Sequence, residues 1–433
     1  MRVTLAQPGG FDYTRDPSIS VEAPLTPPLA LGYLKAYAQS HDPSLEIQII
    51  EPWALEPETP DTLAQKVVST APRVAGFSCY VWNVERVVKT ARLIKERDTS
   101  IFILLGGPEA YNLSNLLTET AVDAVVVGPG EKPFTAFLHR FALGQSWEDV
   151  PGVTSRSKPV NASSGARPEP SLETIPGPYA SGVFELSRYR HAYMETYRGC
   201  AQRCAYCFYP KKMKGLGFAS PATLAGEVKA LAQAGTRYVI LIDSIFNLWP
   251  WAAQVCGMVE ENRAPGMEFS ADIMAELVTE KFCRAARRAG FVEFQAGLQS
   301  VNPLALENIH RRLNRQKFER GARLLRDYGF RVNVDLILGL PGDDMDDVWR
   351  GVEYLQNLPV DDIRVALLRV LPGTGLWENQ RLLGLEFDNS APYYLRRSAR
   401  INPGQINAFF DGGNHRVYHG QGMAAGEGIN DVR

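Results

Sequence analysis

The sequence lacks long apolar runs, a strong net charge and any internal repeat, and these absences exclude several classes of protein. No stretch approaches the roughly 20 apolar residues that a membrane-spanning helix needs, and the start of the chain lacks the apolar core of a signal peptide. The formal net charge is −2, which gives no long-range attraction to nucleic acid or to an anionic membrane. We therefore expect a cytoplasmic protein that binds neither a nucleic acid nor a membrane.

The composition is typical of a globular protein with more than one domain. The 433 residues are 45% hydrophobic and 22% charged, and this length can supply two hydrophobic cores of ordinary size. In the reducing cytoplasm, clustered cysteines indicate ligands or catalytic thiols before they indicate disulfides. Of the six cysteines, Cys79, Cys256 and Cys283 are scattered in apolar surroundings, and we predict that they are buried small hydrophobes.

Residues 1–150 alternate short apolar runs with segments of helical periodicity. The predicted strands are Arg2–Gln7, Glu46–Pro52, Arg73–Cys79, Ile101–Gly107 and Asp123–Gly128, and the predicted helices lie near 29–40, 59–71, 82–98, 113–121 and 131–143. Such units, with strands apolar enough to be buried on both faces, predict an α/β fold with a doubly wound, flavodoxin- or Rossmann-like parallel sheet. Ligands of such sheets bind beyond the carboxyl ends of the strands.

The rest of the chain divides into three segments. Residues 151–189 are rich in Pro, Ser and Gly and are predicted to be a linker. Alternation resumes over residues 190–385, where the predicted strands are Tyr193–Arg198, Arg237–Asp243, Met267–Ile273, Val292–Gln299, Arg331–Leu338 and Asp362–Val370. These βα units are fewer than a closed barrel needs. They predict a partial (β/α)6 TIM barrel with an open side. Residues 386–433 are predicted to be a C-terminal extension with a Gly-rich tail that carries His415 and His419.

Three cysteines form the strongest local signal in the sequence. Cys200, Cys204 and Cys207 directly follow the first predicted barrel strand with the spacing C-x3-C-x2-C. Three thiolates on one loop can bind three irons of a 4Fe–4S cluster. The fourth iron has no local cysteine and stays open to an exogenous ligand, such as the amine and carboxylate of S-adenosylmethionine (SAM).

A zinc site is the alternative interpretation of this motif. Structural zinc needs four ligands, usually in two pairs, and no second C-x2-C or H-x3-H pair lies near the loop. The histidines are mostly dispersed. His415 and His419 lie far downstream, and His191, which lies just upstream, is the possible fourth ligand. The pattern favours the cluster.

The cysteine motif, its place after the first barrel strand and the βα units together resemble the radical SAM superfamily, over residues 190 to about 385. The resemblance implies that the backbone near Tyr206 meets the adenine of SAM. The Gly-Gly-Glu-like element of the family is absent here, and Asp243 is the substitute expected to receive the SAM amine. The other positions implied to contact SAM are Ser270, Asp272, Gln299, Ser300 and Leu338, and either Arg311 or Arg312 could pair with the SAM carboxylate.

The first domain resembles the cobalamin-binding (B12-binding-like) domain that precedes the barrel in one subgroup of this superfamily. The resemblance is carried by Pro27–Leu34, Gly76–Asn83, Leu105–Glu109, Gly128–Phe134 and Ile175–Tyr179. It implies that cobalamin lies on the carboxyl edge of the sheet, past Ser78, Gly106, Gly107 and Gly128. The cobalt-binding histidine of some cobalamin proteins is missing from the loop that begins at Gln7. Many relatives lack it too, so a vestigial domain that binds no cobalamin is the alternative.

Together these resemblances imply a radical SAM enzyme with a 4Fe–4S cluster, SAM and cobalamin as cofactors. The expected reaction cleaves SAM reductively at the cluster and methylates an unactivated carbon of a small molecule or natural-product intermediate. An electron donor such as flavodoxin or ferredoxin is the expected protein partner. The alternatives are a cobalamin-independent radical SAM enzyme (rearrangement, ring formation or 3-amino-3-carboxypropyl transfer) and a non-catalytic iron–sulfur or SAM-binding sensor.

Overall fold

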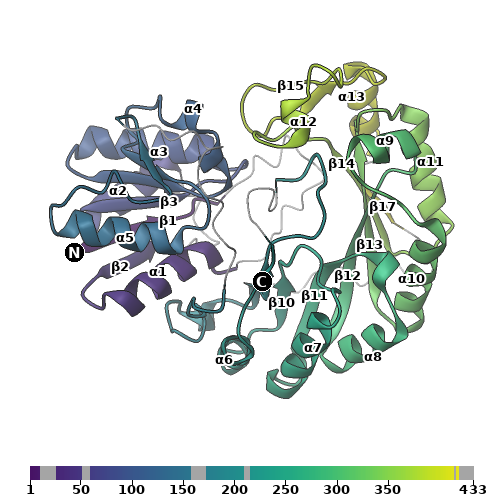
Figure 1. Cartoon of the computed structure of the whole chain (residues 1–433), viewed down its shortest axis with the longest axis horizontal. Helices are drawn as coiled ribbons and strands as arrows, with labels where there is room; N and C mark the ends of the chain where they lie inside the picture. The colour runs from purple at the N-terminus through teal and green to yellow at the C-terminus, as the bar shows by residue number, and fades with distance from the viewer. Residues whose placement is uncertain (10–25, 51–58, 158–171, 209–214, 414–415, 419–433) are drawn as a thin grey trace.

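Two large sheets, each covered by helices, and two small two-stranded sheets make up the computed structural model over the residues it describes (Figure 1). It describes residues 1–9, 26–50, 59–157, 172–208, 215–413 and 416–418. Figure 1 shows the first domain on the left and the barrel on the right, with the helices of the barrel along its outer side. None of the helices in these ranges has the length and apolarity needed to cross a membrane.

The first sheet has a flavodoxin-like strand order. Its strands are β1 (Arg2–Ala6), β2 (Glu46–Ile50), β3 (Val74–Ser78), β4 (Phe102–Gly106), β5 (Ala124–Val126) and β6 (Val153–Ser155), in the order β2-β1-β3-β4-β5-β6. The strands β1 to β5 are parallel, as predicted, and β6 is antiparallel to β5. The helices are α1 (Leu29–His41), α2 (Pro60–Ser69), α3 (Val84–Arg97), α4 (Leu113–Leu116) and α5 (Glu131–Ala142), with a 3₁₀ turn η1 (Pro108–Tyr111).

Helices cover both faces of this sheet. The pair α2 and α3 packs on one face over a core that includes Leu63, Val67, Val87 and Ile94. The pair α1 and α5 covers the other face, and the core on that side continues without a break into the barrel. The doubly wound fold therefore shares one of its two cores with the second domain.

Part of the predicted linker is folded. Strand β6 extends the first sheet, and large apolar side chains between the prolines, among them Leu172, Ile175, Tyr179 and Phe184, are buried in the core shared by the two domains. Because the segment is rich in turn-forming residues, the sequence analysis predicted a linker and did not predict that these side chains are buried.

The second sheet confirms the partial barrel. Its parallel strands are β7 (His191–Met194), β10 (Tyr238–Leu241), β11 (Glu268–Ile273), β12 (Phe291–Gln299), β13 (Arg331–Leu338) and β14 (Asp362–Leu367), and β17 (Arg416–Tyr418) pairs antiparallel with β14. The helices are α6 (Pro221–Gln233), α7 (Trp251–Asn262), α8 (Glu280–Arg288), α9 (Pro303–Asn308), α10 (Arg315–Asp327) and α11 (Met345–Gln356), and the 3₁₀ turns are η2 (Leu186–Arg188) and η3 (Ala275–Leu277).

The first predicted barrel strand, Tyr193–Arg198, divides into two. Strand β7 ends at Met194, and the chain then forms β8 (Tyr197–Arg198), which pairs antiparallel with β9 (Gly217–Phe218) outside the barrel sheet. The backbone N–H groups of Thr196 and Tyr197 donate to the carboxylate of Asp243. Because these donors are bound to a side chain, the backbone leaves the sheet at this point.

The C-terminal extension is also folded over much of its length. It contains β15 (Glu386–Phe387), β16 (Leu395–Arg397) and α13 (Pro403–Asp411), and it follows the short α12 (Gly375–Glu378). The Tyr393 hydroxyl donates to the Glu109 carboxylate of the first domain at 2.9 Å. His415 and His419, like most of the Gly-rich tail, lie outside the described residues.

Candidate active site between the two domains

The three predicted cluster ligands lie on one loop between β8 and β9. Cys204 is buried, Cys200 and Cys207 are half-buried, and all six cysteines of the chain are free thiols. Gly199 precedes the first ligand with a φ of +105°, and a Cβ there would lie 2.3 Å from the Gly215 carbonyl oxygen. Glycine at this position therefore lets the two arms of the hairpin approach each other and turns the chain into the loop.

The number of ligands on this loop matches three irons of a cluster more closely than one structural zinc ion. In the part of the chain that the structure describes, no three His, Cys, Asp or Glu side chains are placed to hold one metal ion together. A zinc site needs such convergence, whereas each thiolate of a cubane binds a different iron. His191 begins β7, at the opposite end of that strand from the cysteine loop, which removes it as a nearby fourth ligand.

The middle of the loop is fixed from two sides. The Ala205 N–H donates to the Ile309 carbonyl at 2.9 Å, and the Ala205 carbonyl accepts from the Leu376 N–H at 2.9 Å. These partners come from the connection after β12 and from α12, so the barrel itself sets the position of the loop. The next residue, Tyr206, is half-buried, and burial raises the pKa of its phenol.

Ser270 and Asp272 lie on the concave face of the barrel sheet. The alternate residues of β11 are buried in the core under the helices, so Ser270 and Asp272 share the opposite face. Ser270 is buried and lies near the Tyr238 hydroxyl of the neighbouring strand. The structure thus places these two predicted SAM contacts on one face, with different degrees of exposure.

Asp272 belongs to a polar layer that crosses several strands. The layer consists of Asp272 on β11, Gln295 on β12, Asp335 on β13 and Arg364 on β14. The Gln295 amide donates to Asp335, and Arg364 donates to the Gln295 oxygen at 3.2 Å. Asp272 remains accessible to water although it lies deep in the molecule, and burial, with the nearby Asp335 charge, raises its pKa to about 7. Its carboxylate has no hydrogen-bond partner among the described residues, so it is open to a ligand.

Asp243 has a structural role, and its contact with the SAM amine stays a prediction. Its side chain is fully buried, and it accepts hydrogen bonds from the Thr196 N–H at 2.7 Å, the Thr196 hydroxyl at 2.5 Å and the Tyr197 N–H at 3.2 Å. Burial raises its pKa to about 7 in spite of these bonds. Because both oxygens accept hydrogen bonds from this segment, the carboxylate joins β8 to β10.

The end of β12 carries two of the predicted SAM contacts. Ser300 is buried, donates to Asp343 at 2.9 Å and accepts from the Asn302 N–H at 3.0 Å, so its hydroxyl anchors the loop. Gln299 is half-buried with a φ of +72°, and its amide folds back over Gly297. Of the two, only Gln299 keeps a side chain that could turn toward a ligand.

The predicted apolar contact on β13, Leu338, faces the core under the helices. Leu338 is fully buried in the core under the helices, whereas its neighbour Ile337 is half-buried and shares the concave face with Asp335. Since successive side chains of a strand point to opposite faces, an adenine-packing role on this strand fits Ile337 and not Leu338.

Of the two candidate arginines, Arg311 reaches the cysteine loop. Its Nη1 lies 3.9 Å from the Cys204 sulfur, and its Nη2 donates to the Gly297 carbonyl at 2.8 Å. Arg312 is exposed. The two arginines are adjacent in the sequence, but only Arg311 contacts the cysteine loop in the structure.

All the residues predicted to contact cobalamin line one cavity of about 280 Å³ at the carboxyl edge of the first sheet. Ser78, Gly106, Gly107 and Gly128 contribute to its wall, together with apolar side chains of the first domain. Gly107 has a φ of +99°, and a Cβ there would lie 2.6 Å from the Cys79 carbonyl oxygen. The small residues leave space at this edge for part of a large ring.

The opposite wall of this cavity contains a buried ion-pair network that the sequence did not predict. Arg198 of the barrel lies 2.7 Å from Glu131 and 2.9 Å from Glu195, and its guanidinium stacks over the Tyr33 ring. Burial raises the pKa of Glu195, whereas for Glu131 the nearby Arg198 outweighs burial and lowers the pKa. Glu131 and Arg198 belong to motifs noted in the sequence, but only the domain arrangement brings them together.

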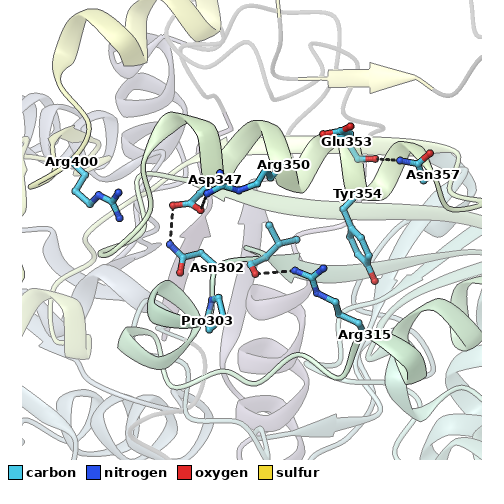
Figure 2. Close-up of a pocket in the computed structure, with 10 residues that line it drawn as sticks. Asn302, Pro303, Arg315, Asp347, Arg350, Glu353, Tyr354, Asn357 and Arg400 are labelled. Carbon is cyan, nitrogen blue, oxygen red and sulfur yellow. Dashed lines mark hydrogen bonds and ion pairs between the residues drawn. The ribbon is translucent and has the colours of Figure 1, made fainter.

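A second pocket, of about 610 Å³, lies on the outside of the barrel (Figure 2). Its arginines are largely occupied: Arg350 pairs with Asp347, which also accepts from Asn302 at 2.8 Å, and Arg315 donates to the Val301 carbonyl at 3.3 Å. No predicted site residue lines this groove, and we assign it no function.

Comparison with known proteins identifies both domains. Residues 194–355 match the model of the radical SAM superfamily, and residues 20–138 match the model of the B12 binding domain. The chain is 26% identical over 387 residues to the 2-(S-pantetheinyl)-carbapenam-3-carboxylate methyltransferase of Streptantibioticus cattleyicolor. The matched region is 82% of this chain and 55% of that protein. The chain is also 26% identical over 372 residues to the cobalamin-dependent radical SAM methyltransferase TokK of Streptomyces tokunonensis, covering 81% and 54%.

The chain thus spans about half the length of these two relatives. A solved structure of the radical S-adenosylmethionine methyltransferase TsrM from Kitasatospora setae, with cobalamin and a [4Fe-4S] cluster bound, has the same fold, with a TM-score of 0.72 at 19% identity over 96% of this chain and 87% of that one. The family models imply a 4Fe–4S cluster, SAM and cobalamin as cofactors. The chain therefore contains a radical SAM domain that follows an N-terminal B12-binding domain.

Proposed function

We propose that the chain is a cobalamin-dependent radical SAM methyltransferase that acts on an unactivated carbon of a small molecule or natural-product intermediate. One observation carries the proposal: the cavity at the carboxyl edge of the first sheet is bordered by Arg198 and Phe208, which flank the three cysteines in the sequence. A cofactor on the sheet edge and a cluster on the cysteine loop would therefore face the same space. The named activities of the two methyltransferase relatives support this reading.

When bound, the cluster supplies the electron that cleaves SAM, and cobalamin supplies a methyl group. The chain itself holds these groups in place. Cys200, Cys204 and Cys207 would bind three irons, and the hydrogen bonds of Ala205 fix the loop against the barrel. The buried Arg198 joins its domain to Glu131 of the other and closes the wall between them. This positioning and the exclusion of water are what the protein contributes to such chemistry.

The polar layer on the concave face of the barrel is suited to orient a polar substrate. The Asp272 carboxylate has no hydrogen-bond partner among the described residues, whereas the Gln295 amide donates to Asp335 and its oxygen accepts from Arg364. A substrate that donates a hydrogen bond would therefore find a free acceptor at Asp272 while the rest of the layer holds the site rigid. We propose Asp272 as a substrate-orienting residue.

The proposal is tested by anaerobic reconstitution with iron, sulfide and hydroxocobalamin, followed by desalting. We expect the wild type to retain one cluster and one corrinoid per chain and to form 5′-deoxyadenosine from SAM with dithionite. Cys204→Ala should lose the cluster and the SAM cleavage, whereas Cys256→Ala, at a buried cysteine in α7, should keep both. SAM cleavage without bound corrinoid would favour a cobalamin-independent enzyme, and a cluster that leaves SAM intact would favour a sensor.

We also propose a cytoplasmic location and an electron donor such as flavodoxin or ferredoxin. The free state of all six cysteines is the state that a reducing compartment maintains. The identity of the donor stays a prediction.

A further inference from the structure

We infer that Arg311 is a positioning residue that raises the reduction potential of the cluster by holding a fixed positive charge against the sulfur of Cys204. This inference rests on the proposed function, because it concerns the cluster that the three cysteines would bind. It assigns to Arg311 a role toward the cluster, in place of the pairing with the SAM carboxylate that the sequence suggested.

The guanidinium is held at two points. Nη1 lies 3.9 Å from the Cys204 sulfur, which is within the range of a hydrogen bond to sulfur, and Nη2 donates to the Gly297 carbonyl near the end of β12 at 2.8 Å. The planar fork of an arginine can make both contacts at once, whereas the single ammonium of a lysine cannot span them in the same way. The charge is therefore fixed relative to the sulfur.

The backbone around Arg311 is bonded to the same loop. The Arg311 N–H donates to the Leu306 carbonyl at 2.8 Å, and the carbonyl of Ile309, two residues earlier, accepts from the Ala205 N–H at 2.9 Å. Ala205 directly follows Cys204. A direct hydrogen bond thus links the segment that carries the cation to the loop that carries the sulfur, so the contact does not depend on the arginine side chain alone.

The charge balance gives the direction of the effect. Thiolate ligands and an added electron both increase the negative charge of a cluster, and hydrogen bonds and positive charge at the ligand sulfurs stabilise the reduced form. The titratable groups that interact with Arg311 are Cys204, Tyr206 and Glu276. Glu276 is half-buried on η3 and moderates the positive charge of Arg311. Loss of Arg311 should therefore make the cluster harder to reduce.

The test is a redox titration of the reconstituted cluster, followed by electron paramagnetic resonance without SAM. At the potential that reduces half of the wild-type cluster, Arg311→Met should show about a tenfold lower ratio of reduced to oxidised cluster, a shift of about 59 mV for a one-electron couple. Arg311→Lys should shift in the same direction by less. Arg312→Met removes a neighbouring, exposed arginine and should titrate like the wild type.

Equal potentials for Arg311→Met and the wild type would overturn the inference. If the potentials are equal and SAM binds more weakly, Arg311 belongs to the SAM carboxylate instead. Should Arg311→Met fail to retain iron, Arg311→Lys decides the matter: a negative shift supports the inference, and no shift contradicts it. If the wild type binds no cluster, the proposed function itself fails, so the two failures are distinguishable.

Discussion

At the scale of single residues, the cysteine loop depends on a glycine that makes no chemical contribution of its own. Replacement of Gly199 by alanine would place a Cβ 2.3 Å from the Gly215 carbonyl oxygen at a φ of +105°. We expect Gly199→Ala to lower the free energy of unfolding by about 1–3 kcal/mol and to reduce the iron retained after reconstitution, because the hairpin that carries the ligands must shift. Denaturant unfolding and iron analysis check both effects.

The matched control is Gly235→Ala. Gly235 also has a positive φ, of +79°, but a Cβ there meets nothing within 4 Å. This variant has the backbone strain without the clash, so it should lose some stability and keep its iron. Equal iron loss in both variants would show that the cysteine loop does not depend on the close approach at Gly199.

At the scale of elements, the buried carboxylate that joins β8 to β10 should give the fold a measurable pH dependence. Asp243 has an ordinary pKa of 3.8 and a pKa of about 7 in the folded chain. Between these values the folded state binds more protons than the unfolded state, so the contribution of Asp243 to stability falls as the pH rises through this window and levels off above it. Asp243→Asn removes this titration while it keeps an oxygen that can accept from the backbone.

We therefore expect the free energy of unfolding of Asp243→Asn, relative to wild type, to rise between about pH 5 and about pH 8. Urea unfolding across this range measures the difference. The exposed Asp411, at the end of α13, provides the control Asp411→Asn, whose difference from wild type should stay constant. A constant difference for Asp243→Asn as well would contradict the account of this carboxylate.

Hydrophobic periodicity predicted most of the helices and strands. It did not predict where a strand leaves a sheet or where an additional strand joins its edge. The predicted strand Arg331–Leu338 agrees with β13 at both ends, because apolar side chains recur at every second position and turns bound the segment. The predicted strand Tyr193–Arg198 divides because Asp243, distant in sequence, takes its backbone donors. Strand β6 is too short for a periodic signal and forms because the edge of β5 is free to pair.

The same limit applies to the site. The three cysteines and the small residues of the sheet edge carry their signal in local spacing. The small residues line one cavity together with Arg198 and Phe208, which flank the cysteines in the sequence. The predictions for Asp243 and Leu338 came from their positions along a strand. On a strand, a shift of one residue moves a side chain to the other face of the sheet, as for Leu338. A hydrogen-bond partner distant in sequence can also engage the side chain, as Thr196 does for Asp243. The ion pairs of Arg198 depend on two domains and leave no pattern in either sequence segment.

At the scale of the whole molecule, a hydrogen bond from the C-terminal extension helps to hold the two domains together. The Tyr393 hydroxyl donates to buried Glu109 and accepts from Asn112 at 2.9 Å. We expect Tyr393→Phe to lower the free energy of unfolding by about 1–3 kcal/mol, because a buried carboxylate loses its partner. We also expect weaker retention of corrinoid, since Glu109 directly follows Pro108, which lines the cavity between the domains.

Tyr328→Phe is the control for this variant. It removes a hydroxyl that accepts from the exposed Arg284 and lies on the outside of the barrel. Denaturant unfolding and corrinoid analysis after desalting compare the two. Wild-type corrinoid retention in Tyr393→Phe would show that the extension does not support the cavity between the domains.

The central claim is that three thiolates leave one iron of the cluster open to SAM. The most direct test is electron–nuclear double resonance of the reduced cluster with SAM that carries ¹⁵N in its amine and ¹⁷O in its carboxylate. We predict hyperfine coupling from both labels in the wild type. A spectrum of a reduced cluster without coupling from either label would contradict the account.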